Sequence, residues 1–345
     1  MRKILLGGYT SKENKGIAEI AFSEEKETLE ERNLLLSVGK PTYLMEKGGR
    51  IFSCVEMEGK GGMAMIENAE IKAVCLKEGA SPCHISSDVN GDYFYLSNYH
   101  EGTISVVKKT ANDLEEICCI HHIGSSVHPN QEKAHVHFAE LCPRGRYLFV
   151  CDLGCDEVYL YLPQENGQLV EHLRYRTPAG FGPRHLCFHP EKALVYVLGE
   201  LSNQILVLQA DTETGNLIEK QKISMLPEDF QGESAGAAVR ISLDGKFLYA
   251  SNRGHDSIVV YQVSEEGLLE MIQHISTCGS FPRDFALSPD EDYVVAANQK
   301  TDNLTLYRRD KESGQLELLQ KDVFAPECVC VCFEKEKEVS SCNMM

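Results

Sequence analysis

The stretch Ser242-Leu-Asp-Gly-Lys-Phe-Leu-Tyr-Ala-Ser-Asn252, followed by Ile258-Val-Val-Tyr261, carries the pattern that decides the fold. An Asp/Gly turn leads into a run of β-forming residues, and a short polar loop separates this run from a second one. Turn residues that flank short runs rich in Val, Ile, Tyr and Phe are typical of antiparallel strands. We therefore expect two paired strands here, and we call Asn252, the last residue of the first run, the marker residue.

The same pattern recurs along the chain. Four further clear copies are Asp88–Asn98 with Ile104–Val107, Pro143–Asp152 with Val158–Tyr161, His189–Gly199 with Ile205–Leu208, and Ser288–Asn298 with Leu304–Tyr307. In all five copies the second run begins six residues after the marker residue. Two weaker copies around Leu5–Gly8 and Ile51–Val55 complete a set of seven, with markers near positions 8, 55, 98, 152, 199, 252 and 298.

The spacing of the markers predicts the architecture. Successive markers lie 43 to 54 residues apart, which suits a four-stranded blade of a β-propeller. The sequence contains no Trp, which argues against the WD40 type of propeller. We predict an all-β, seven-bladed β-propeller as a single domain over residues 1–334, closed by the run Cys328–Phe333 pairing into the first blade, with residues 335–345 as a polar C-terminal tail.

Composition and charge narrow the function. Of the 345 residues, 43% are hydrophobic and 25% are charged, as in ordinary globular proteins. The net charge of −18 opposes binding to a nucleic acid, and no apolar run has the length of a membrane span. We therefore expect neither partner, and an anion site would have to be built from a few cations in a cleft.

Most of the 14 cysteines are expected to be free, buried thiols of a cytoplasmic protein, because the first residues lack the apolar length of a signal peptide. Cys328, Cys330 and Cys332 alternate with apolar residues, as on one face of a strand. No Cys pair has the spacing of a structural zinc site, so we expect no metal.

Equivalent positions in the repeats should line the channel together. Fifteen residues before the markers stand Cys83, His137, Arg184, Ala237 and Arg283. One residue after them stand Tyr99, Leu153, Glu200, Arg253 and Gln299. Several cations that meet a His and a Glu favour an anion site in the channel, although ion pairs that hold the blades together are the structural alternative.

Two histidines stand out in the fourth repeat. Alternation along a strand would point His135 and His137 to the same face, where they could chelate a metal or act as a base and its orienting partner. Alternatively they are two ordinary hydrogen-bonding residues. The nearby His121, His122 and His128 are expected at the surface.

Four motifs resemble one known family. They are Gly7-Gly-Tyr-Thr10, His135-Val-His137, Gly182-Pro-Arg-His-Leu-Cys-Phe-His-Pro190 and Ser280-Phe-Pro-Arg-Asp-Phe-Ala-Leu-Ser-Pro289. Together they resemble the lactonase family of seven-bladed propellers, which includes bacterial 6-phosphogluconolactonases and fungal carboxy-muconate cyclases. The resemblance spans nearly the whole chain.

The resemblance implies a chemistry and a set of residues. The muconate branch of the family uses a His, an Arg, a Glu and a second Arg, and its 16-residue step from Arg to Glu is kept between Arg184 and Glu200. The implied catalytic residues are His135, His137, Arg184, Glu200 and Arg253. Apart from the resemblance, we expect His185 and Arg283 to bind the substrate.

The expected function is hydrolysis of a small anionic sugar lactone, 6-phosphogluconolactone, without a cofactor or metal, with one of the two histidines as general base. A cycloisomerase that forms a lactone from a muconate and a non-catalytic interaction propeller are the alternatives. A metal-dependent oxidoreductase or sugar-binding propeller is a weaker one. The oligomeric state has no signature in the sequence.

Overall fold

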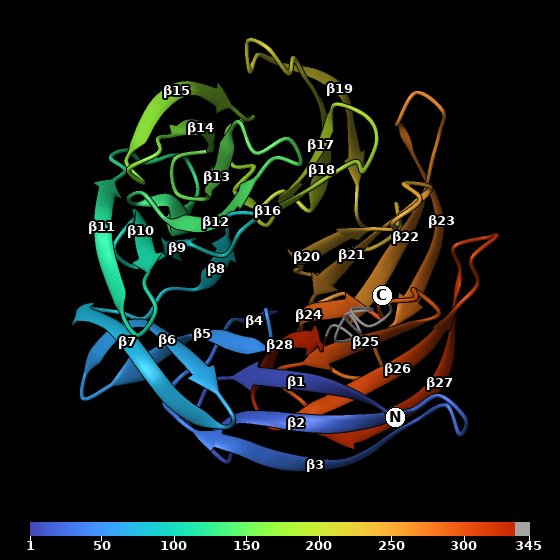
Figure 1. Cartoon of the computed structure of the whole chain (residues 1–345). Coiled ribbons are helices and arrows are strands. Elements are labelled where there is room, and N and C mark those ends of the chain that lie inside the picture. The colour runs from blue at the N-terminus through green and yellow to red at the C-terminus, as the bar shows by residue number, and fades with distance from the viewer. Residues whose placement is uncertain (335–345) are drawn as a thin grey trace, which may run out of the picture.

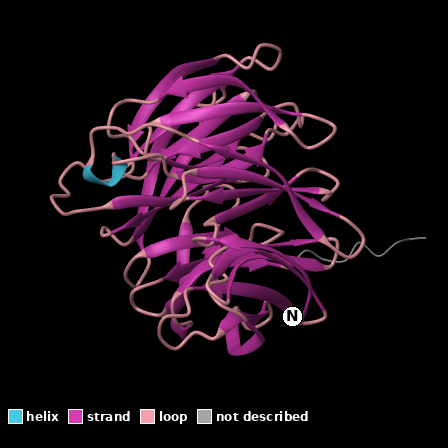
Figure 2. Ribbon diagram, turned by 90° about the vertical axis from the view of Figure 1, so that its left-hand side faces the viewer, coloured by secondary structure: helices cyan, strands magenta, loops and turns pink. Residues whose placement is uncertain are grey.

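The computed structural model describes residues 1–334, which form seven four-stranded antiparallel sheets arranged as blades around a central channel (Figure 1). The predicted all-β, seven-bladed propeller is confirmed. Strands make up almost all of the regular structure (Figure 2), with one 3-10 turn, η1 (Pro129–Gln131), among the described residues. The tail predicted for 335–345 lies outside the described residues.

The blades follow one another in chain order, and in each blade the innermost strand, beside the channel, is named first. Blade 1 is β28 (Cys328–Phe333), β1 (Arg2–Gly8), β2 (Gly16–Ser23) and β3 (Thr28–Ser37); blade 2 is β4 (Leu44–Lys47), β5 (Arg50–Met57), β6 (Lys60–Glu67) and β7 (Glu70–Glu78). Blade 3 is β8 (His84–Ser87), β9 (Tyr93–Asn98), β10 (Thr103–Lys109) and β11 (Leu114–His121); blade 4 is β12 (Val136–Leu141), β13 (Leu148–Asp152), β14 (Glu157–Pro163) and β15 (Leu169–Arg176).

The remaining three blades complete the ring. Blade 5 is β16 (Pro183–Phe188), β17 (Leu194–Gly199), β18 (Gln204–Ala210) and β19 (Leu217–Ser224). Blade 6 is β20 (Ala235–Ile241), β21 (Phe247–Arg253), β22 (Ser257–Val263) and β23 (Leu269–Ser276). Blade 7 is β24 (Pro282–Leu287), β25 (Tyr293–Asn298), β26 (Asn303–Arg309) and β27 (Leu316–Phe324). No helix in this described part has the length and hydropathy needed to cross a membrane.

The two ends of the chain share blade 1, as predicted. The C-terminal strand β28 lies innermost and pairs antiparallel with β1, with Leu5 opposite Cys332 and Leu6 opposite Val331. The alternation of Cys and Val therefore belongs to a buried inner strand. All cysteines of the described residues are free thiols.

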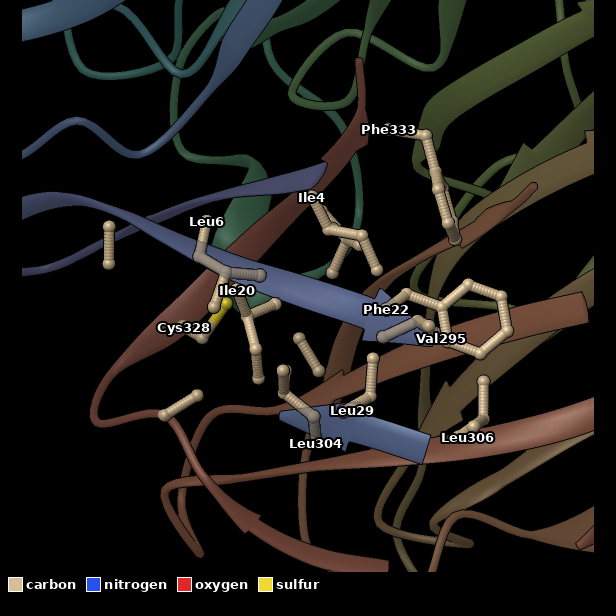
Figure 3. Packing of buried hydrophobic residues seen from close by; sticks show 14 residues of the cluster. Ile4, Leu6, Ile20, Phe22, Leu29, Val295, Leu304, Leu306, Cys328 and Phe333 are labelled. Carbon is tan, nitrogen blue, oxygen red and sulfur yellow. The ribbon is translucent and has the colours of Figure 1, made fainter. Parts of the chain in front are cut away.

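The hydrophobic core lies between neighbouring blades. Figure 3 shows the cluster in which Ile4 and Phe22 of blade 1 face Val295 and Leu306 of blade 7. Each fully buried side chain of this size stabilises the fold by about 1.5–3 kcal/mol. Because every strand face is covered by the next blade, the ring has to close before all of this area is buried.

The marker residues explain the repeat in physical terms. Asn98, Asn252 and Asn298 each donate a side-chain hydrogen bond to a backbone carbonyl of the segment that leads in from the preceding blade, over 2.7, 3.0 and 2.9 Å respectively. In blade 4 the marker Asp152 accepts instead, from Nδ1 of His122 over 2.8 Å. His122 is only 7% exposed, so its predicted surface position is wrong. Its ring bonds to the marker residue of blade 4, whereas a backbone carbonyl bonds to the markers of blades 3, 6 and 7.

A second repeated contact aims the loops toward the channel. Four residues after the marker, Asp156, Asp256 and Asp302 adopt positive φ values of 56°, 53° and 56°, a conformation that Asp and Asn tolerate better than other side chains. Their carboxylates accept backbone N–H groups of the next blade's entry loop, for example Gly182 on Asp156 and Phe281 on Asp256 at 2.7 and 2.8 Å. Each contact fixes the loop just before an inner strand.

Candidate active site

Three inner strands carry a β-bulge at the same place, and the extra residue is a predicted site residue each time. In β16, Pro183 pairs with Gly199 and His185 with Leu198, which leaves Arg184 as the additional residue. The same shift occurs at His137 in β12 and at Arg283 in β24. A bulge re-aims a side chain relative to the strand's alternation, and these three side chains, from blades 4, 5 and 7, line one cavity.

This cavity lies in the channel near the start of the inner strands. It encloses about 30 Å³, room for one or two water molecules. Its walls include Tyr9, Cys83 and His185 beside the three bulge residues. Tyr9 also lines a wider hollow of about 260 Å³ together with Lys12, Gln299 and Lys300, so the two spaces adjoin at its ring.

Glu200 joins two of the arginines. Its Oε2 lies 2.9 Å from Nε of Arg184 and 2.8 Å from Nη2 of Arg253. Burial by itself would raise the pKa of Glu200, but the nearby arginines hold it below its usual value, so the carboxyl is ionised. Arg184 and Glu200 belong to blade 5 and Arg253 to blade 6, so the Glu200–Arg253 pair is the blade-joining ion pair considered from the sequence.

The arginines leave the site positively charged. Arg283 makes no ion pair with any described residue, and its guanidinium carbon lies 5.8 Å from the centroid of the Tyr9 ring. Burial lowers the pKa of Arg184 to about 9, with Arg253 adding to the effect and Glu200 opposing it. Asp284 also lines the cavity, but Arg240 pairs with it at 3.0 Å. Arg184, Arg253 and Arg283 against Glu200 therefore leave a local charge of +2 near neutral pH, in a protein whose net charge is −18.

His137 has unused hydrogen-bonding capacity. Neither of its ring nitrogens has a hydrogen-bond partner among residues 1–334, and Nδ1 is buried. The ring packs edge to face with His185, with centroids 5.3 Å apart. Burial, and then the charges of Arg184 and Arg283, keep the pKa of His137 well below its usual value. His137 is therefore a neutral imidazole with a free lone pair.

His185 supports Arg184. Its Nε2 lies 3.1 Å from Nη1 of Arg184, and because a guanidinium can only donate, Nε2 accepts and the ring proton sits on Nδ1. Arg184 Nη1 also donates to the carbonyl of Ala237 at 2.5 Å. Burial, followed by the Arg184 charge, lowers the pKa of His185 well below its usual value. The side chain lines the cavity as a neutral ring.

His135 differs from His137 in its hydrogen bonds. Its Nδ1 donates to the backbone carbonyl of Tyr99 at 2.8 Å, and Nε2 lies 3.3 Å from Oε1 of Glu132. The bulge at His137 breaks the simple alternation on which the predicted common face depended. Nδ1 of His135 is therefore held by a backbone carbonyl and its Nε2 has no hydrogen-bond partner in the described chain, whereas neither ring nitrogen of His137 is bonded.

The comparisons with known proteins agree with this fold. The family model described as "Lactonase, 7-bladed beta-propeller" matches residues 3–333. The chain belongs to this lactonase family. The 6-phosphogluconolactonase of Bacillus subtilis (strain 168) is 37% identical over 339 residues, covering 95% of this chain and 97% of the relative.

Two solved structures of this lactonase fold are similar over almost their whole length. A crystal structure of a protein from Lactobacillus plantarum has a TM-score of 0.94 and 40% identity, covering 97% of this chain and 99% of the other. The periplasmic gluconolactonase of Pseudomonas aeruginosa has a TM-score of 0.89 and 28% identity, with coverages of 96% and 98%. The expected family resemblance is confirmed, and with it the expectation of an enzyme of the lactonase type, a carboxylic ester hydrolase.

A stack of rings divides the channel of this lactonase. His84 packs on Phe138 at 4.1 Å and on Tyr43 at 4.4 Å between ring centroids, and Phe138 lies 4.9 Å from His185. Beyond these rings a separate hollow of about 630 Å³ is lined by Tyr43, Phe138 and others. The arginine site is therefore reached from the Tyr9 side of the channel.

Two aromatic residues in the wall of the candidate site, Tyr9 and Tyr43, were not predicted from the sequence. Tyr9 follows the first marker by one residue, so extending the alignment of marker-plus-one positions to the weak first repeat would have found it. Tyr43 lies in the entry segment of blade 2, whose repeat is too irregular for any alignment to place it. His/Cys/Asp/Glu groups of three or more with metal-site geometry do not occur in the described part of the chain.

Proposed function

We propose that this lactonase hydrolyses the lactone of a phosphorylated sugar acid, 6-phosphogluconolactone, to 6-phosphogluconate. The observation that carries the proposal is a local charge of +2 around a neutral His137 without a hydrogen-bond partner in the described chain. Cations that converge in a buried site suit an anionic substrate. The name of the B. subtilis relative supports the same substrate.

His137 acts as the base and then as the acid in this proposal. An unprotonated ring nitrogen takes a proton from a water molecule while the water oxygen attacks the lactone carbonyl carbon. The tetrahedral oxyanion collapses, the bond to the ring oxygen breaks, and the imidazolium returns the proton to that oxygen. The low pKa of His137 makes its protonated form a strong acid for the last step, and an anionic substrate beside the arginines raises this pKa on binding.

The arginines bind the substrate and stabilise the negative charge that forms during the reaction. Arg283 has no counter-ion in the described chain, so it is the group most available for the substrate's phosphate. Arg184 and Arg253 are held by Glu200 at 2.9 and 2.8 Å, which fixes their guanidiniums for stabilising negative charge at the carbonyl oxygen. His185 lines the same cavity, and its Nε2 accepts a hydrogen bond from Nη1 of Arg184, whose Nε faces Glu200. A cytoplasmic location stays a prediction, and the P. aeruginosa relative is named as periplasmic.

An NMR assay of lactone opening tests the proposal. The wild type is expected to accelerate opening of 6-phosphogluconolactone over the spontaneous rate, and Arg283→Ala is expected to raise KM at least about tenfold, because one buried charge-assisted contact is worth about 1.5–3 kcal/mol. Arg184→Ala is expected to lower kcat about 100-fold. The control Arg144→Ala removes an exposed arginine far from the cavity.

Two results would redirect the assignment. A wild type that opens gluconolactone without phosphate equally well, with an unchanged KM in Arg283→Ala, would overturn the phosphate subsite. Failure to open any lactone, combined with lactone formation from a muconate, would favour the cycloisomerase; failure in both assays would favour the interaction propeller.

A further inference from the structure

Tyr99 is held between the two histidines of the site, although it belongs to none of the family motifs and lies outside the cavity walls. It follows the marker Asn98 directly, after β9. Its ring stacks on His135 with centroids 4.1 Å apart and planes 10° from parallel. It also meets His137 edge to face, at 5.9 Å between centroids. One half-buried tyrosine thus touches both members of the His-x-His pair.

The position of Tyr99 is fixed by its support. The Nδ1–H of His135 donates to the Tyr99 carbonyl at 2.8 Å, while the backbone N–H of His135 donates to Oδ1 of Asp152 at 2.9 Å. Asp152 is fully buried and bound in turn by His122 at 2.8 Å. The buried chain from His122 to Tyr99 uses several polar groups to hold a single aromatic ring.

The hydroxyl at the end of this supported ring has no partner of its own. No residue in 1–334 hydrogen-bonds to it. The edge-to-face contact with His137 places the Tyr99 ring beside the proposed base. Burial, and then the charge of Glu200, raise the pKa of Tyr99 to about 12. The group is therefore a neutral hydrogen-bond donor throughout the working pH range.

We propose that the Tyr99 hydroxyl donates a hydrogen bond to the lactone carbonyl oxygen as it becomes an oxyanion, and that His135 is the positioning residue that holds Tyr99 for this contact. The inference rests on the proposed lactone hydrolysis and deepens it. A preorganised donor aimed at developing charge lowers the barrier because it needs no reorganisation during the reaction. The Tyr99 hydroxyl would act together with Arg184 and Arg253 on this oxygen, while Arg283 binds the phosphate.

The assignment gives the two histidines different tasks. His137 exchanges the proton, and His135 never meets the substrate. Loss of His135 should therefore act on the rate only through Tyr99. This separates the proposal from a general structural role, in which damage at His135 and at Tyr99 would add.

Steady-state kinetics of four variants test this coupling. Tyr99→Phe keeps the ring and the stack and is expected to lower kcat about 100-fold, within the range measured for the loss of one oxyanion donor, with KM changed less than about threefold. His135→Leu is expected to lower kcat by a similar factor. His135→Asn, whose amide can still donate to the Tyr99 carbonyl, should recover part of the loss.

The double variant Tyr99→Phe/His135→Leu gives the decisive comparison. Its kcat is expected within about threefold of Tyr99→Phe alone, because residues that act through one contact are non-additive. Tyr95→Phe, which removes a hydroxyl from strand β9 just before Tyr99, serves as the matched control and should behave as wild type. Thermal unfolding of every variant identifies those that fail to fold.

The outcomes separate the two proposals. An active wild type with an unchanged kcat in Tyr99→Phe overturns the role of Tyr99 and leaves the lactonase assignment intact. Losses that multiply in the double variant overturn the positioning role of His135. A wild type that opens no lactone overturns both proposals together.

Discussion

The side chains of the candidate site have cations as neighbours. His137 lies close to Arg184 and Arg283, and its burial and their charges both disfavour the imidazolium. The sequence predicted a base at His135 or His137. The structure adds that His137, in this environment, stays neutral well into the acid range.

The pH profile of the free enzyme should report this shift. A base must be unprotonated to act, so kcat/KM is retained above the pKa of His137 and lost below it. Since that pKa is depressed, kcat/KM for gluconolactone should stay flat from about pH 7.5 down to about pH 6, the usual value being about 6.5. The unphosphorylated lactone is used because a phosphate group titrates near pH 6 itself.

A variant provides the control for this profile. Arg283→Ala removes one of the charges that lower the pKa of His137, so its acid limb should move to higher pH. An acid limb at about pH 6.5 or above in the wild type, unmoved in Arg283→Ala, would show that another group is the base.

At the scale of elements, the site depends on one repeated turn. The marker residue binds the preceding blade, and the acidic residue four positions later binds the entry loop of the next one. Asp256 accepts the backbone N–H groups of Gly254 and Phe281 at 3.0 and 2.8 Å. The second of these lies two residues before Arg283, so the turn of blade 6 places the free cation of blade 7.

Asp256→Ala should uncouple the turn from the loop. It removes two accepted hydrogen bonds, each worth about 1 kcal/mol, and puts Ala at a φ of 53°, which costs about 1–2 kcal/mol. The free energy of unfolding in urea should fall by about 3–4 kcal/mol, the sum of these losses, and KM for the phosphorylated lactone should rise. Asp256→Asn keeps an acceptor oxygen and tolerates the same φ, so it should remain near wild type. Equal losses in both variants would assign the effect to the charge rather than to the hydrogen bonds.

The strands and the ring could be predicted because their signals are local. Turn residues and alternating apolar runs recur at a fixed offset of six residues, and the alignment of these repeats brought His137, Arg184 and Arg283 to one level of the channel. The bulge that separates His137 from His135 is a property of register between β12 and β13, which no single strand encodes. The hydrogen bond between His122 and Asp152 could not be predicted either, because the two residues lie 30 positions apart in the sequence.

At the scale of the whole molecule, the ring is closed by a strand from the other end of the chain. β28 pairs with β1 of blade 1, and the backbone N–H of Val331 donates to Oδ2 of Asp284 in blade 7 at 3.0 Å. On the other side, the backbone N–H of Leu44 in blade 2 contacts Sγ of Cys330 at 3.4 Å. One inner strand thus links three blades, and the arginine site lies inside the ring that it closes.

Removing this strand should abolish cooperative folding. β28 buries Cys328, Val329, Cys330, Val331 and Phe333, and losing them costs on the order of 5–10 kcal/mol at about 1.5–3 kcal/mol for each larger side chain. That is comparable with the whole stability of a typical domain, about 5–15 kcal/mol. A chain ending at Glu327 should show no cooperative urea transition by circular dichroism, whereas the control ending at Glu334 retains every described strand and should unfold in a single transition. If the shorter chain unfolded cooperatively as well, the remaining strands would be sufficient to hold the blades together, and the position of the arginines would have to be maintained by contacts between adjacent blades alone.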